Sequence, residues 1–175
     1  NGRVFRISFE GSESKKTSDD ARKVAMAKLV TAKPEELVDL LDHSNEWFVR
    51  MARRRLQETV NIPGLSTSST LTSSLAGPIA ERLLQRLQET TTVENKLRLL
   101  WTAHALGGVD SARLLELLNA SGSENEYLRA WAIQLELEDR IASPPFLAKM
   151  ISLASEDPSP VVRLYLASSL QRLPI

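Results

Sequence analysis

The chain has 175 residues, 42% of them hydrophobic and 25% charged, a composition that supplies a packed core and excludes general disorder. Its 22 basic and 22 acidic residues cancel, so no overall basic field favours nucleic acid or an anionic membrane, and no apolar run approaches the roughly 20 residues that span a bilayer. The absence of cysteine excludes disulfides, thiolate metal sites, thiol catalysis and covalent haem attachment within this sequence.

The first eleven residues, NGRVFRISFEG, differ in pattern from the rest of the chain. Their apolar residues alternate with polar ones: Phe5, Ile7 and Phe9. A period of two predicts a half-buried strand, which needs a sheet to pair with, so we expect residues 1–11 to be an extended β arm that ends a preceding β-domain. We place the domain boundary between residues 1–20, the arm and a polar linker, and residues 21–175, the helical domain.

From residue 34 onward a unit recurs that consists of a short apolar helix, a turn and a longer helix opening with a hydrophobic–Arg step. The arginines of these second helices are 48, 31 and 34 residues apart: Arg50, Arg98, Arg129 and Arg163. The long interval contains residues 61–75, of which eight are Ser or Thr, and without this insertion it falls to 33. A fixed period of about 30–47 residues built from two helices predicts an α-solenoid. We therefore expect an all-α superhelix of about four helix pairs, with a loop insertion at residues 61–75.

Turn residues and periodic apolar positions set the boundaries of the expected helices. These helices occupy residues 21–30, 34–42, 46–58, 78–89, 93–106, 111–119, 127–139, 145–155 and 160–173. Ser44 or Asn45 is expected to cap one helix, Asp110 or Ser111 another, and Gly107 with Gly108 to end the helix between them. Prolines are expected at helix starts and not in helix interiors.

The four recurring arginines have two interpretations. An arginine at the same place in every repeat favours a structural position that bonds turn carboxylates and carbonyls, as between Asp157 and Arg163. The alternative is a basic ridge along the concave surface. Three further arginines do not recur, and with neighbouring apolar residues they form the predicted interaction surface: Trp47, Phe48, Met51, Arg53, Arg54 and Arg55.

The aromatic residues and histidines give little indication of catalysis. Trp131 lies in the apolar stripe of its helix and Trp101 follows two leucines, which favours core positions over a stacking platform for bases. Full burial of Trp131 predicts that its replacement by alanine costs about 3–5 kcal/mol. His43 and His104 lack metal-binding spacing, and no nucleophile–base pair or phosphate loop is present. We therefore predict no catalytic, cofactor-binding or metal-binding residue.

The pattern of residues 34–175, carried by VRMA at 49–52, LRAWA at 128–132 and VRLYLA at 162–167, resembles HEAT repeats of the phycobilisome-lyase-like kind. Together, NGRVFRISFEG, LVDLLDHSNEWFVRMARRRLQE and KLRLLWTAHALGG resemble membrane-bound dehydrogenase proteins of planctomycetes. In those proteins a sugar-dehydrogenase-like β-propeller precedes the repeats and a cytochrome c domain follows. The resemblance implies a bacterial oxidoreductase parent in the periplasm or cell envelope, with haem elsewhere in that parent. It carries over no catalytic position, because this sequence contains no CxxCH motif.

The predicted function is therefore a non-catalytic scaffold that links the propeller and haem domains of a larger dehydrogenase. Its expected partners are other domains of the parent chain or another protein, with self-association through residues 1–11 as a further expectation. Two alternatives stay open: a nucleic-acid-binding HEAT protein similar to DNA glycosylases, acting through Arg53–Arg55 and the tryptophans, and a bilin-lyase-like HEAT protein. Zero net charge disfavours nucleic acid.

Overall fold

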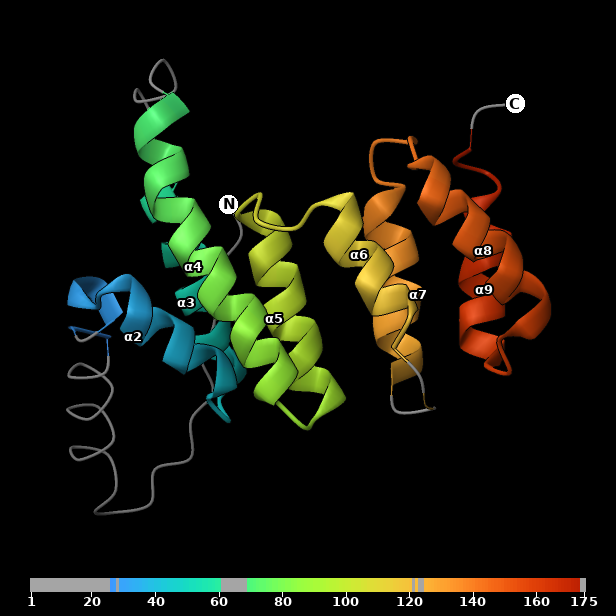
Figure 1. The fold of residues 1–175 in the computed structure, drawn as a ribbon. Coiled ribbons are helices and arrows are strands. Elements are labelled where there is room, and N and C mark those ends of the chain that lie inside the picture. Colours follow the sequence, from blue (N-terminus) through green and yellow to red (C-terminus); the bar gives the residue numbers. More distant parts are fainter. Residues whose placement is uncertain (1–25, 28, 61–68, 121, 123–124, 174–175) are drawn as a thin grey trace, which may run out of the picture.

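The computed structural model describes residues 26–27, 29–60, 69–120, 122 and 125–173, and every regular element among them is a helix (Figure 1). The predicted all-α class is confirmed, while the strand and linker expected at residues 1–20 lie outside the described residues. Of the helix expected at 21–30, the described residues 26–27 and 29–30 are helical. The elements that follow are α2 (Pro34–Asp39), η1 (Leu40–Asp42), α3 (Glu46–Val60), α4 (Ser69–Glu89), α5 (Val93–Ala105), α6 (Ser111–Leu118), α7 (Glu126–Glu136), α8 (Pro144–Glu156) and α9 (Pro160–Ser169).

The helices pack as consecutive pairs. Helix α2 with η1 contacts α3, α4 contacts α5, α6 contacts α7, and α8 contacts α9. Successive pairs then stack, because α2 contacts α4, α5 contacts α7, α6 contacts α8 and α7 contacts α9. In Figure 1 the pairs follow one another across the molecule in chain order, from α2 (blue) to α9 (red). The described chain is therefore a row of helical hairpins in which each pair touches its neighbours.

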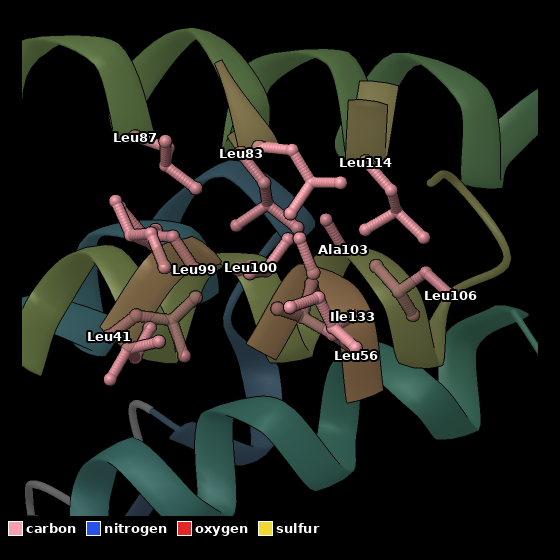
Figure 2. Close-up of a cluster of buried hydrophobic side chains, with 14 of the residues drawn as sticks. Leu41, Leu56, Leu83, Leu87, Leu99, Leu100, Ala103, Leu106, Leu114 and Ile133 are labelled. Atoms are coloured by element: carbon pink, nitrogen blue, oxygen red, sulfur yellow. The ribbon is translucent and has the colours of Figure 1, made fainter. Parts of the chain in front are cut away.

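One apolar cluster runs through the whole row. Figure 2 shows its central part, where side chains from η1, α3, α4, α5, α6 and α7 meet. Leu99, Leu100 and Ala103 of α5 are fully buried at this point, since α5 is covered from several sides. Burying a leucine side chain stabilises a fold by about 1.5–3 kcal/mol. Stability is thus shared across the contacts between neighbouring helix pairs.

Turn chemistry ends and starts several helices where the sequence indicated. Gly107 has φ +72°, and its N–H donates to the carbonyl of His104 while the N–H of Gly108 donates to that of Ala103, which ends α5. The Asp110 side chain accepts from the N–H of Arg113 at 2.9 Å and so caps α6. Asn45 likewise accepts from the N–H of Trp47 at 2.9 Å at the start of α3.

Helix α4 differs most from the sequence prediction. It begins at Ser69, so the loop expected at residues 61–75 is wrong for 69–75, and residues 61–68 lie outside the described part of the chain. Pro78 consequently stands inside a helix instead of starting it. Serine and threonine cost well under about 1 kcal/mol each in a helix, so their abundance does not prevent one. Gly77 reduces the conflict with Pro78, because a glycine has no Cβ to meet the following proline ring.

Candidate interaction surface

Helix α3 carries all six residues of the predicted interaction surface, which differ in exposure and in contacts. Trp47 is exposed, and its ring meets the edge of Phe48 with centroids 5.1 Å apart. Phe48 and Met51 are half-buried and pack against the core. Of the three apolar residues, Trp47 is therefore the most exposed, at 39%.

Two of the three adjacent arginines share one carboxylate. Arg54 Nε donates to Glu58 Oε1 at 2.8 Å, and Arg55 Nη1 donates to Glu58 Oε2 at 3.1 Å. These hydrogen bonds lower the pKa of Glu58 below its ordinary value. Arg55 Nη2 also donates to the Val30 carbonyl at 3.1 Å, which ties α3 to the residues preceding α2. Glu58 therefore offsets part of the positive charge on this side of α3.

Arg53 leaves α3 in another direction. Its Nε donates to Thr102 Oγ1 of α5 at 3.2 Å, and its guanidinium lies 5.9 Å from the centre of the Trp101 ring. Burial against α5 lowers the pKa of Arg53. Trp101 in turn meets Trp131 of α7 edge-on, with ring centroids 4.8 Å apart. Arg53, Trp101 and Trp131 thus form a row that connects α3, α5 and α7.

Both tryptophans of this row are half-buried, so the expectation of a fully buried Trp131 needs correction. Helix α7 lies between α5 and α9, and its enclosed apolar positions are Leu128, Ala130, Ala132 and Ile133. The larger ring of Trp131 lies at the edge of this layer, where one side of it packs and the other meets solvent.

Replacing Trp131 by alanine is therefore expected to cost about 1–3 kcal/mol, less than the roughly 3–5 kcal/mol of a fully buried aromatic ring. Urea denaturation followed by circular dichroism measures this loss. Trp47→Ala is the control and should cost less than Trp131→Ala, since Trp47 is the more exposed of the two rings. Equal losses for the two variants would contradict the packing of Trp131 against Trp101.

Arg129 makes the most extensive contacts of the recurring arginines. Its Nε and Nη2 donate to the Asp157 carboxylate at 2.8 and 3.2 Å, and both side chains are buried. Its Nη1 donates to the carbonyls of Ala120 and Gly122 at 2.8 and 2.9 Å. Arg129 therefore joins the turn before α7 to the turn before α9.

The other recurring arginines differ in their contacts. Arg163 Nη1 donates to the carbonyls of Asp157 and Pro158 at 2.9 and 3.1 Å. Arg98 donates to Asn95 Oδ1 at 2.8 Å and forms an ion pair with Glu46. Arg50 is exposed and has no hydrogen bond or ion pair to the rest of the described chain.

The difference does not come from helix phase. The residue before each arginine is buried in all four helices: Val49, Leu97, Leu128 and Val162. The four arginines therefore leave their helices in the same direction relative to the core and differ in the partners within reach.

Ion pairs join each helix pair to the next. Arg86 of α4 pairs with Asp39 and with Asp42 Oδ2, the latter at 2.6 Å from Nη2. Burial alone would lower the pKa of Arg86, but the hydrogen bonds to the two aspartates raise it above its ordinary value. The remaining pairs between elements are Arg98–Glu46, Arg113–Glu81, His104–Glu138 and Arg129–Asp157. Sequence reasoning missed Arg86, and the available signal was the pair of aspartates three residues apart on one helical turn.

Both histidines make structural contacts. His43 Nδ1 accepts from the N–H of Asn45 at 2.9 Å, and its ring lies 4.7 Å from that of Phe48. His104 Nε2 lies 2.6 Å from Glu138 Oε2. Within the described ranges, no three or more His, Asp or Glu side chains gather to hold a metal ion, and none of the helices found there combines the length and apolar character that crossing a membrane requires.

These contacts and the fold define an all-α protein made of stacked helical hairpins. Comparison of the chain with protein-family models, with curated proteins and with solved structures found no match.

Proposed function

We propose that this chain is a non-catalytic scaffold, a stiff HEAT-like superhelix that holds partner proteins at fixed relative positions. One observation carries the proposal: every ion pair that joins two elements of the described chain links one helix pair to the next. Apolar packing holds each junction, and charged contacts of defined geometry add to it. The chain thus uses much of its polar chemistry to fix the relative placement of its repeats.

A partner surface on α3 follows from the exposed residues. Trp47, Arg50 and Arg54 lie three, four and seven positions apart, a spacing that gathers side chains on one side of a helix. Tryptophan and arginine contribute strongly to protein interfaces. Trp47 and Arg50 have free surface, whereas the charge of Arg54 is shared with Glu58. The contacts of Arg53, Arg54 and Arg55 favour a protein partner over the phosphate backbone of a nucleic acid, since each arginine already has a protein contact.

Distance measurements between spin labels test the stiffness that a scaffold needs. The chain has no cysteine, so Arg54→Cys and Leu164→Cys place single labels at exposed positions in the first and last helix pairs. A single narrow distance distribution is expected, and adding Arg129→Ala should broaden it. A broad distribution in the otherwise unchanged chain would contradict the scaffold. Titration with duplex DNA at low salt should give no salt-dependent binding, and such binding would favour the nucleic-acid alternative instead.

The resemblance to planctomycete membrane-bound dehydrogenases extends the proposal. In that context the stack sets the distance between a substrate-oxidising propeller and a haem domain. The expected finding is one reading frame that encodes a propeller before this sequence and a CxxCH motif after it. A frame with neither would remove the dehydrogenase context, while the scaffold proposal would stand on the contacts between repeats.

A further inference from the structure

An apolar groove of about 420 Å³ lies on α8 and α9. It is lined by Met150 and Ile151 of α8 and by Leu166, Ala167 and Leu170 on the α9 side. Ile151 and Leu170 are 74% and 70% exposed, unusual values for large aliphatic side chains. Figure 1 shows α8 and α9 as the last pair of the row, with no described helix beyond them. Large aliphatic side chains that lie exposed side by side on one face indicate a contact surface.

The preceding helix pair shows what covers equivalent positions. Ile133 of α7 is buried, whereas its counterpart Ala167 of α9 is exposed. The α6–α7 pair has neighbouring pairs on both sides. A position that is buried in a covered pair is therefore exposed in the last one.

Arg163 repeats half of the contacts of Arg129. Nη1 of each arginine donates to two carbonyls of the turn before its own helix. Nε and Nη2 of Arg129 also hold the carboxylate of Asp157, which belongs to the next turn. Nε and Nη2 of Arg163 have no such partner within the described chain, and Arg163 lies at the apolar groove. By analogy with Arg129, Nε and Nη2 of Arg163 are placed to bind a carboxylate that belongs to a neighbouring turn.

We propose that the α8–α9 face binds a helical hairpin of a protein partner whose interhelical turn carries an aspartate or glutamate, docked as α8–α9 docks on α6–α7. The apolar groove takes the hairpin's hydrophobic stripe, and Arg163 takes the carboxylate. This inference names a partner class for the scaffold proposed above and rests on that function.

A second copy of the chain fits this face less well. A two-fold dimer would place the face against itself, bringing two copies of Arg163 together on a surface whose lining contains no carboxylate. A head-to-tail contact would need a free acidic turn, but Asp157 is already held by Arg129 and Asp42 by Arg86. Charge complementarity therefore favours a different protein that brings its own acidic turn.

The test extends the full chain at its C-terminus with a further copy of residues 141–173, which contain the hairpin that occupies the equivalent place on α6–α7. The extension is expected to raise the melting temperature and to slow amide hydrogen exchange in α8 and α9. Arg163→Ala should lower the melting temperature by at least about 5 °C in the extended chain and by less than about 2 °C in the unextended chain. In the added copy, the aspartate that corresponds to Asp157 is the expected partner of Arg163. Replacing it by alanine should make the effect of Arg163→Ala nearly the same in the extended and unextended chains.

Three results would overturn the inference: an extension that leaves melting and hydrogen exchange unchanged, an Arg163→Ala effect of equal size in both chains, or a dimeric unextended chain that Ile151→Lys converts to a monomer. The last result would assign the groove to a second copy. Spin-label distances report separately on the scaffold. A broad distance distribution together with a stabilising extension would contradict the proposal of a stiff scaffold and still support the proposed docking face.

Discussion

Arg129→Ala is expected to lower the free energy of unfolding by about 3–5 kcal/mol, because it leaves the Asp157 carboxylate buried without its counter-charge. The substitution also removes the donor to the carbonyls of Ala120 and Gly122. Asp157 keeps one hydrogen bond, from the N–H of Ser159 at 2.9 Å, which is too little to hold a buried charge. The loss should loosen the junction between α6–α7 and α8–α9 before the rest of the stack.

Urea denaturation gives the size of this loss, and hydrogen exchange gives its location. Arg54→Ala is the matched control, because Arg54 also pairs with a carboxylate but is 69% exposed, so its loss should be below about 1 kcal/mol. In a double-mutant cycle, Arg129→Ala should cost much less once Asp157→Ala is present. Similar losses for Arg129→Ala and Arg54→Ala would show that the buried pair does not stabilise the junction.

Gly108→Ala is expected to cost about 2–3 kcal/mol through overpacking. A Cβ at this position would lie 2.0 Å from the Cβ of Ala80, so α4 and the turn after α5 would have to separate. An alanine Cβ has no rotamer with which to move aside, and Ala80 is itself buried in α4. The glycine is therefore needed for close approach between two elements, whereas Gly107 is needed for its positive φ.

The double variant Gly108→Ala with Ala80→Gly tests whether the contact with Ala80 causes the loss. Ala80→Gly alone should cost about 1 kcal/mol as a glycine inside a helix. Combined, the two changes should cost less than Gly108→Ala alone, because the clashing atom is gone. Thermal denaturation of the four proteins measures the coupling. Purely additive losses would mean that the approach of the turn to α4 does not limit the packing.

The helix pairs were predictable because their signals are local. Gly107, Asp110 and Asn45 act on backbone groups within a few residues, so their roles follow from the sequence alone. The start of α4 was not predictable in this way. Serine and threonine favour loops only weakly, and a preceding glycine lets Pro78 stand inside a helix.

The ion pairs between repeats depend on how the pairs stack, which a single sequence does not specify. Arg86 meets Asp42 across 44 residues, and Arg98 meets Glu46 across 52. The direction of Arg53 has a simpler cause. Adjacent residues of a helix point about 100° apart, so Arg53 reaches α5 while Arg54 and Arg55 share Glu58. Helix phase could have predicted that separation.

The ion pairs at the junctions differ in their access to water, which gives the stack an uneven response to ionic strength. Arg86–Asp39 and Arg113–Glu81 each include a carboxylate at the surface, whereas Arg129–Asp157 is enclosed. Dissolved ions screen exposed charges over a Debye length of about 8 Å at physiological salt, and enclosed charges much less. In concentrated salt we therefore expect the two earlier junctions to loosen before the junction between α6–α7 and α8–α9.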